Sequence, residues 1–243
     1  MFIELILVGI FIGTMSGFFG IGGGIILVPL LMAIGVDIKS AIGISIVQMV
    51  FSSVFGSYLN YKKGSLDVVM VTTIGIGGFI GALLSGVITS NISEMSLEII
   101  FLSFASFALL RLFFKIKKQK RQKEVNRILL LTIGIPLGAI SMAIGVGGSI
   151  VLVPILVGFL HVPLKKAISA GLFFVIFSSV AGFISHIKTG PIDYESGITI
   201  GLASLVGVYN GVHLKDRVNV TLQRRLLILF YLLIVLYLSW RIF

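Results

Sequence analysis

Residues 13–35, GTMSGFFGIGGGIILVPLLMAIG, form an apolar stretch that closely spaced glycines and one proline interrupt. In a helix interior, Gly costs about 1 kcal/mol relative to Ala, and Pro costs about 3 kcal/mol. A helix exposed to lipid cannot break freely, because its unpaired backbone groups find no water; a break is tolerated where the backbone is buried in protein or lines a cavity. The stretch therefore predicts a discontinuous helix whose broken centre is the functional site.

Composition places this stretch in a membrane. The 243 residues are 57% hydrophobic and 12% charged, whereas soluble domains carry about 25% charged residues. Apolar runs near the ~20 residues needed to cross a bilayer recur along the chain. We predict an all-α integral membrane protein whose main partner is the lipid bilayer. The net charge of +10 is attributed to Lys and Arg in cytoplasmic loops, so no nucleic-acid partner is expected.

The chain contains two copies of one unit. When Pro29 is aligned with Pro154, the tripeptide LVP recurs, and after one inserted residue the K-x-G-x-x-D pattern of 62–67 falls on 188–193. The other aligned pairs include Gly9 with Gly134, Gly13 with Gly138, Ser16 with Ser141, Gly20 with Gly145, Gly22 with Gly147, Gly23 with Gly148, and 51–54 with 177–180. We predict a first membrane repeat over 1–114, a basic cytoplasmic linker over 115–127 and a second repeat over 128–243.

Each repeat is expected to hold four apolar units, the first of them broken. The units are 3–35, 41–60, 67–90 and 95–114 in the first repeat, and 128–160, 167–187, 194–213 and 221–243 in the second. As helices, 3–19 and 25–35 rise about 25 Å and 16 Å. These lengths suit a re-entrant hairpin better than two crossings of a ~30 Å bilayer core.

The distribution of basic residues favours inverted over parallel repeats. With the linker in the cytoplasm, inversion places every Lys and Arg on the cytoplasmic side except Lys39, Lys188 and Arg241. A parallel arrangement would move outward the basic residues Lys165, Lys166, Lys215, Arg217, Arg224 and Arg225. Because Lys and Arg gather in cytoplasmic loops, we predict inverted repeats.

The glycine turns are candidate anion sites. The run Gly22-Gly23-Gly24 opens the short helix predicted over 25–35, and Gly147-Gly148-Ser149 opens the one predicted over 149–160. A helix N-terminus offers unpaired N–H groups and a partial positive charge, and glycine lets a ligand approach the backbone. The alternative is that these glycines only allow tight helix packing. Duplication at both places, beside Ser16 and Ser141, favours a binding site.

The second unit of each repeat adds polar side chains to these turns. Ser45, Gln48 and Ser52 share one helix face, and Phe174 takes the place of Gln48 in the second copy. The serines either line a pathway or hydrogen-bond to carbonyls of neighbouring helices. The complete set of predicted substrate-binding residues is Ser16, Gly20, Gly22, Gly23, Gly24, Gln48, Ser52, Ser53, Ser141, Gly145, Gly147, Gly148, Ser149, Ser178 and Ser179.

The positions of the acidic residues and the absence of cysteine argue against an enzyme. Every Asp and Glu lies in a loop or at the end of a span, and there is no cysteine, so we expect no acidic proton relay, metal site, cofactor or catalytic centre. Asp67 and Asp193 are predicted helix N-caps. Asn60 aligns with His186, and both are interpreted as interfacial.

The chain resembles the sulfite exporter TauE/SafE family of prokaryotic permeases. The resemblance rests on SGFFGIGGGIILVPLL at 16–31, SMAIGVGGSIVLVPIL at 141–156 and the KKGSLD and KTGPID loops, and it covers essentially the whole chain. It implies a multi-pass protein of the prokaryotic inner membrane, usually drawn with eight spans. It also implies a substrate such as sulfite, a sulfonate or another small sulfur-containing or organic anion, moved mostly outward.

We therefore predict a secondary transporter of a small anion, bound where two broken helices meet near mid-membrane. An anion channel, and an intramembrane binding or assembly protein that transports nothing, remain as alternatives. A coupling proton or sodium ion is a further expected partner. The residues leave open which anion is moved, its direction, the coupling ion and the oligomeric state.

Overall fold

The computed structural model describes residues 2–64, 68–113 and 127–242, and in these ranges every regular element is a helix. The predicted all-α fold is confirmed. In chain order, the helices are α1 (Phe2–Phe19), α2 (Gly24–Ala33), α3 (Ile38–Lys62), α4 (Val68–Ala82), α5 (Ser85–Asn91), α6 (Glu94–Phe113), α7 (Arg127–Ala143), α8 (Ser149–Gly158), α9 (Leu164–Ile187), α10 (Tyr194–Arg217) and α11 (Val220–Ile242). The linker predicted over 115–127 lies outside the described residues except for Arg127, which begins α7.

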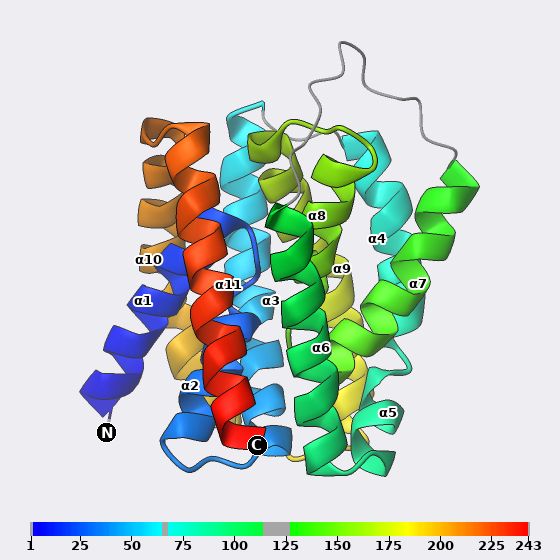
Figure 1. Ribbon diagram of the computed structural model, residues 1–243. Helices are drawn as coiled ribbons and strands as arrows, with labels where there is room; N and C mark the ends of the chain where they lie inside the picture. The colour runs from blue at the N-terminus through cyan, green and yellow to red at the C-terminus, as the bar shows by residue number, and fades with distance from the viewer. Residues whose placement is uncertain (1, 65–67, 114–126, 243) are drawn as a thin grey trace.

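The first unit of each repeat is two helices rather than one. α1 ends at Phe19 and α2 begins at Gly24, while α7 ends at Ala143 and α8 begins at Ser149. In Figure 1, α1 rises from the lower edge of the molecule and α2 returns to it, whereas α7 descends from the upper edge and α8 returns there. Both termini of the described chain lie at the lower edge.

Helix length separates the broken units from the others. Five described helices or helix pairs are long and apolar enough to cross a membrane: 38–62, 70–91, 164–187, 194–217 and 220–242. The shorter apolar helices include the four arms of the two broken units. With these spans, the chain has the character of a multi-pass membrane protein.

Glycine faces hold each broken unit against the opposite repeat. α1 packs mainly on α10, and α7 packs mainly on α4. A Cβ atom on Gly13 of α1 would collide with the carbonyl oxygen of Ser204 on α10, and one on Gly138 of α7 would collide with that of Gly78 on α4. Such small-residue contacts let helix backbones approach closely.

The central helices are α3 and α9, which pack against each other and carry the buried polar residues. α3 also packs on α10, and α9 also packs on α4. α6 and α11 pack together and cover α8 and, through fewer contacts, α2. The second arms of the broken units, α2 and α8, are therefore enclosed between α3 and α9 on one side and the α6–α11 pair on the other.

One predicted unit differs from expectation. The unit 67–90 is not one continuous helix, because α4 ends at Ala82 and α5 begins at Ser85. The hydroxyl of Ser185 on α9 donates to the carbonyl of Leu83 at 2.7 Å and accepts from the N–H of Gly86 at 3.0 Å. A side chain from another repeat thus satisfies the backbone groups freed by the break, which the local sequence does not signal.

Aspartates cap two of the long helices. Asp193 precedes α10 and accepts from the N–H of Ser196 at 3.1 Å, as predicted, while Asp67 lies outside the described residues. A hydrogen bond from the Ser196 hydroxyl holds the pKa of Asp193 below its ordinary value. Asp37 caps α3 in the same way, accepting from the N–H of Ser40 at 2.9 Å.

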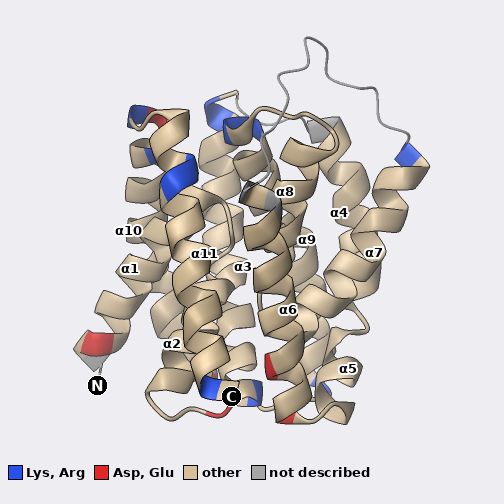
Figure 2. Cartoon of the chain, in the orientation of Figure 1, with Lys and Arg blue, Asp and Glu red and all other residues tan. Residues whose placement is uncertain are grey.

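Charge is unevenly distributed between the two edges. Figure 2 shows most of the blue Lys and Arg ribbon at the upper edge, where α3 and α10 end and α9 and α11 begin. The lower edge carries fewer basic residues, mixed with acidic ones near the C-terminus of α11. Between the edges the ribbon is almost free of charged residues, as expected for the part of the protein that faces lipid.

Candidate functional site

The two glycine turns meet between α3 and α9. The hydroxyl of Ser45 on α3 donates to the carbonyl of Gly145 in the second turn at 2.8 Å. A Cβ atom on Gly22 would lie 3.3 Å from the sulfur of Met49, and one on Gly147 would lie 2.8 Å from the same atom. The structure thus brings together, from residues 125 positions apart, the two turns that the sequence singled out.

The first half-site is the start of α2 beside Gln48. Gly23 is the N-cap of α2, has a φ of 94°, and leaves the helix start without a side-chain cap. Only glycine adopts this left-handed conformation readily. Gln48 is fully buried, neither atom of its amide has a hydrogen-bond partner, and a Cβ on Gly23 would lie 2.7 Å from its Oε1. A buried polar group without a partner is costly, so this amide marks a place where a ligand can bind.

The second half-site is the start of α8 beside Phe174. Gly148 is its N-cap with a φ of 83°, again without a side-chain cap. A Cβ on Gly148 would lie 2.5 Å from Cε1 of Phe174, where the first half-site has Gln48. Ser149 is fully buried and its hydroxyl has no partner. The two half-sites share their backbone but differ in polarity.

The paired serines support the turns. Ser52 donates to the carbonyl of Gly22 at 3.1 Å, and Ser178 donates to the carbonyl of Gly147 at 2.9 Å. Ser53 and Ser179 donate to carbonyls of their own helices, at Val50 and Ile176. In this closed arrangement the serine hydroxyls therefore brace the turns rather than point into an open channel.

The predicted residues outside these contacts are also buried. Ser16 on α1 has no hydrogen-bond partner for its hydroxyl, whereas its copy Ser141 donates to the carbonyl of Leu137 on its own helix. Gly24 faces the carbonyl of Gly145, and the carbonyl of Gly20 lies near Gly171 on α9. Thirteen of the fifteen predicted residues thus lie in or next to the two turns, whereas Ser53 and Ser179 donate to carbonyls of their own helices.

The chemistry of the site is that of hydrogen-bond donors without a charged side chain. Two uncapped helix starts present N–H groups and partial positive charge, and Gln48, Ser16 and Ser149 add neutral polar groups. Within the described residues, no three His, Cys, Asp or Glu side chains are grouped so as to hold a metal ion. The arrangement suits a small anion that gives up its water to backbone N–H groups.

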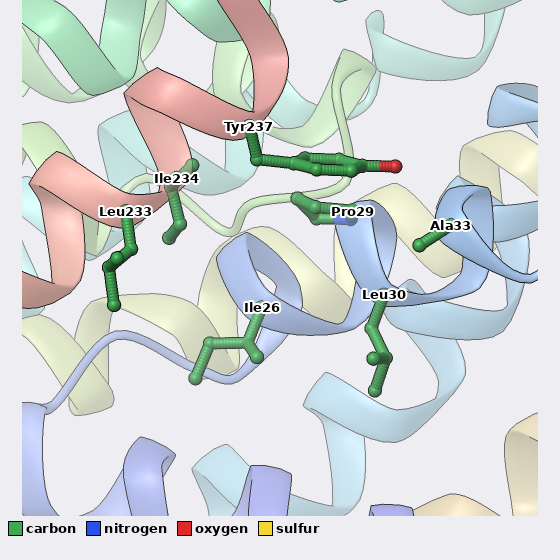
Figure 3. Close-up of a pocket in the computed structure, with 7 residues that line it drawn as sticks. All are labelled: Ile26, Pro29, Leu30, Ala33, Leu233, Ile234 and Tyr237. Carbon is green, nitrogen blue, oxygen red and sulfur yellow. The ribbon is translucent and has the colours of Figure 1, made fainter. Parts of the chain in front are cut away.

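A separate pocket lies between α2 and α11. Figure 3 shows it lined by Ile26, Pro29, Leu30, Ala33, Leu233, Ile234 and Tyr237. Its lining is apolar apart from the Tyr237 hydroxyl, which projects past the pocket in this view. It offers no charged group to an anion, and Pro29 contributes to its wall rather than to the glycine turn.

Two buried polar clusters were not predicted. At the upper edge, Lys215 on α10 donates to Asn60 on α3 at 2.5 Å and to Ser169 on α9 at 3.1 Å. At the lower edge, Nε2 of His186 lies 3.2 Å from the hydroxyl of Thr89. Asn60 and His186 lie near the ends of α3 and α9, but both are buried, with exposed fractions of 0% and 1%.

A helical pattern could have revealed the first cluster. The buried face of α10 runs through Gly197, Gly201, Ser204, Val208 and Gly211 at intervals of three or four residues. The next position on that face is Lys215. Extending the face by one turn would have placed a lysine inside the protein.

Comparisons with known proteins agree with this architecture. The model of the family described as "Sulfite exporter TauE/SafE" matches residues 5–238. The chain is 29% identical over 217 residues to "Probable membrane transporter protein YdhB" of Bacillus subtilis, covering 85% of this chain and 87% of the relative. It is 25% identical to "Probable membrane transporter protein YunE" of the same organism, covering 94% and 92% of the two chains.

An archaeal relative extends the comparison. "Probable membrane transporter protein MJ0441" of Methanocaldococcus jannaschii is 26% identical over 202 residues, covering 78% of this chain and 74% of the relative. No solved structure matches the chain. The names of these relatives specify transport across a membrane and leave the transported substance unstated.

Proposed function

The chain belongs to the sulfite exporter TauE/SafE family of membrane transporters, and we propose that it is a secondary transporter that binds a small anion between its two glycine turns. The bound anion accepts hydrogen bonds from the N–H groups at the starts of α2 and α8. Half-helix N-termini near mid-membrane hold anionic substrates in other transporters built from inverted repeats.

The observation that carries the proposal is the unpartnered amide of Gln48 beside the uncapped start of α2. The side chain is fully buried, and neither its Nε2 nor its Oε1 has a partner. Both amide atoms border the space above Gly23, because a Cβ there would lie 2.7 Å from Oε1 and 3.1 Å from Nε2, and Nε2 is a donor. An anion in that space would satisfy both the amide and the helix start.

The substrate class we propose is a sulfur oxyanion, such as sulfite, or an organic sulfonate. The family description supports sulfite or a related anion. The replacement of Gln48 by Phe174 in the second half-site supports a substrate with one polar and one apolar end, because Phe174 is fully buried against Gly148. A short alkanesulfonate has one charged and one apolar end and fits this asymmetry, whereas sulfoacetate is charged at both ends.

We further propose that the repeats are inverted and that each broken unit is re-entrant, in the inner membrane of a prokaryote. The opposite edges from which α1 and α7 start in Figure 1 support this topology. The packing between the repeats supports it as well, because α1 of the first repeat packs on α10 of the second, and α7 of the second packs on α4 of the first. The upper edge, rich in Lys and Arg in Figure 2, would then face the cytoplasm.

A carrier fits this geometry better than an open channel. Gln48, Ser52, Ser149 and Ser178 all have an exposed fraction of 0%, so the turns are closed from both edges. A closed site at the interface of two repeats is the arrangement expected for alternating access. Flux that is driven by a proton or sodium gradient would identify the coupling ion, and steady gradient-independent flux of many ions would identify a channel.

The test is uptake of radiolabelled sulfite and sulfoacetate into liposomes that contain the purified protein. Gln48→Leu removes the buried amide at nearly constant volume, and we expect it to lower the transport rate at least about tenfold, the effect of losing a hydrogen bond to a charged group. Gly23→Leu and Gly148→Leu are expected to abolish transport while the protein still inserts into the membrane.

Ser204→Ala is the matched control for a lost buried polar group. Ser204 on α10 is fully buried and donates to the carbonyl of Gly201 on its own helix, away from the turns. We expect its transport rate to stay within about twofold of wild type, since the hydroxyl makes a hydrogen bond that is worth little in a membrane helix. Wild-type rates in Gln48→Leu, Gly23→Leu and Gly148→Leu together would refute the proposed site.

A further inference from the structure

A buried lysine occupies the junction of α3, α9 and α10 at the upper edge. Lys215 has an exposed fraction of 1%, although it lies only two residues from the end of α10. Its ammonium donates to Oδ1 of Asn60 at 2.5 Å and to Oγ of Ser169 at 3.1 Å. Each of the three helices therefore contributes one side chain to the cluster, which we call the Lys215 cluster.

The ammonium lacks a carboxylate partner. Among the described residues, the structure pairs no Asp or Glu with Lys215. The neighbouring Asp216 instead points to Lys63, with 2.6 Å between Nζ and Oδ2. A buried charge is normally paired, because removal from water is unfavourable unless an opposite charge compensates. Two neutral oxygens satisfy two of the three ammonium protons and none of the charge.

The cluster lies near the C-terminal end of α3, the helix that also contributes Gln48 to the first half-site. Between these positions α3 carries the buried residues Ser52 and Ser57. At about 100° per residue, Ser57 faces the opposite side of the helix from Gln48, and its hydroxyl has no hydrogen-bond partner. Leu172 of α9 fills the space against Gly56. One helix, rather than a continuous polar face, thus links the glycine turns to Lys215.

The surroundings of Lys215 favour an anion. Lys63 and Lys165 both lie next to the cluster, since Lys63 pairs with Asp216 and Lys165 donates to its carbonyl at 3.2 Å. With Lys215, these side chains carry three positive charges against the one negative charge of Asp216. A positive potential in a region of low dielectric attracts and concentrates anions.

The opposite edge has a neutral counterpart. In the register that aligns Asn60 with His186, Lys215 aligns with Thr89, and His186 and Thr89 contact each other just as Asn60 and Lys215 do. The hydroxyl of Thr89 also donates to the carbonyl of Ala143 at the end of α7 at 2.8 Å. The two clusters are therefore built alike, but of the aligned residues Lys215 and Thr89 only the upper one is a lysine.

We propose that the Lys215 cluster is a second anion-binding site, through which the transported oxyanion passes between the glycine turns and the upper edge. The anion replaces Asn60 and Ser169 as acceptors for the ammonium. The Asn60 amide then donates to another of its oxygens, and the Ser169 hydroxyl turns to it from the carbonyl of Lys165, to which it donates at 3.1 Å. This inference rests on the proposed function for the identity of its ligand. It makes the two faces of the transporter unequal in their affinity for anions.

The first measurement is binding, which does not depend on transport. The melting temperature of the purified full-length protein in detergent is measured with increasing sulfite, because a ligand of the folded state raises it. We expect Lys215→Gln to raise the sulfite concentration needed for a given rise in melting temperature about tenfold or more, because the variant loses one charge-assisted hydrogen bond to the anion. A wild-type response in Lys215→Gln, or no response to sulfite in wild type, overturns the inference.

Lys166→Gln is the matched control. Lys166 lies on the same edge and is exposed, so its removal changes the net charge equally without touching the cluster. We expect its sulfite response to stay within about twofold of wild type, because exposed charges are screened by salt. An equal loss in Lys166→Gln would show a general charge effect and would overturn the inference. Lys215→Arg should keep most of the response.

The second measurement is sulfite flux into inside-out and right-side-out vesicles. Lys215→Gln should raise the half-saturating concentration about tenfold for sulfite presented at the upper edge and leave that for the lower edge unchanged. Equal changes at both faces, or none, overturn the inference while the proposed function stands. Absence of flux in wild type refutes the proposed function. Sulfite binding at the Lys215 cluster is then tested by the melting experiment alone.

A charge swap covers the case in which Lys215→Gln does not fold. The double variant Asn60→Lys, Lys215→Asn keeps one ammonium and one amide in the cluster but exchanges their helices. It should bind sulfite within about fivefold of wild type, since the charge stays at the same place. A folded swap variant without any sulfite response overturns the inference.

Discussion

At the scale of the residue, some buried polar side chains have hydrogen-bond partners within the protein and others have none. Ser45, Ser52 and Ser178 donate to carbonyls of the glycine turns and so hold the broken helices in place. Gln48 is equally buried but has no partner. Since serine hydroxyls readily bond to nearby carbonyls in membrane helices, hydrogen bonding within the protein explains these three serines, while the amide of Gln48 is left for the proposed ligand.

The close contact between the two turns predicts that adding one methyl group at Gly24 lowers the stability of the protein. In Gly24→Ala the new Cβ would collide with the carbonyl oxygen of Gly145 and would come within 2.6 Å of the Ser45 hydroxyl. Because the first obstacle is backbone, we expect a loss of about 1–3 kcal/mol of stability, typical of overpacking, measured as a lower melting temperature in detergent.

The control for this methyl group is Gly190→Ala. Its Cβ would meet its nearest atom, in His186, at 3.5 Å, an ordinary contact. Its melting temperature should therefore match wild type. If Gly24→Ala also melts like wild type, the two turns are farther apart than described.

At the scale of the element, the two broken units are held by equivalent glycine faces. Gly13 of α1 lies against the Ser204 backbone of α10, and its copy Gly138 of α7 lies against the Gly78 backbone of α4. Without a hydrophobic driving force between helices in lipid, such close packing supplies much of their association. Glycines thus pack α1 and α7 against their partner helices, and in the proposed function they also admit the ligand at the turns.

These faces predict paired effects. Gly13→Ala and Gly138→Ala should each lower stability by about 1–3 kcal/mol, because in both the Cβ collides with a backbone oxygen. Since the two contacts are in different helix pairs, the double variant should lose about the sum. Thermal unfolding in detergent measures all three.

Leu7→Ala serves as the comparison on α1. Leu7 is 62% exposed on the face of α1 away from α10, so its truncation should change stability by less than about 0.5 kcal/mol. A loss in Gly13→Ala no larger than in Leu7→Ala would contradict the tight α1–α10 contact.

At the scale of the whole molecule, the two edges differ. The described chain begins and ends at the lower edge, and most Lys and Arg lie at the upper edge. The buried cation of the Lys215 cluster faces the upper edge, and the His186–Thr89 contact faces the lower edge. A duplicated chain therefore forms a membrane transporter whose two edges differ in charge.

The inverted arrangement predicts where the C-terminus lies. A reporter that is active only in the cytoplasm should be active when inserted in the linker at 115–127 and inactive when fused after residue 243. Activity at both positions would establish parallel repeats and refute the inverted topology. Single insertions after Gly64 and Gly190, in the loops before α4 and α10, should give active and inactive reporters respectively.

Sequence alone determined the fold class, the duplication and the position of the turns. Apolar runs of spanning length are expected to form helices in lipid, and the glycines at 22–24 and 147–148, repeated in the same register, indicate a break in such a helix. The helix starts at Asp193 and at the glycine turns followed from local rules of capping and backbone conformation, which need no knowledge of the partner helix.

Only the tertiary structure decided which polar groups are satisfied. Ser52 and Gln48 lie on the same buried face of α3, yet one finds the carbonyl of Gly22 and the other finds no partner. The burial of Lys215 and the break between α4 and α5 likewise depend on side chains from the other repeat, Asn60 and Ser185. Hydrogen-bond satisfaction is a property of contacts between helices distant in sequence, and a linear pattern contains the donors and acceptors but not the distances between them.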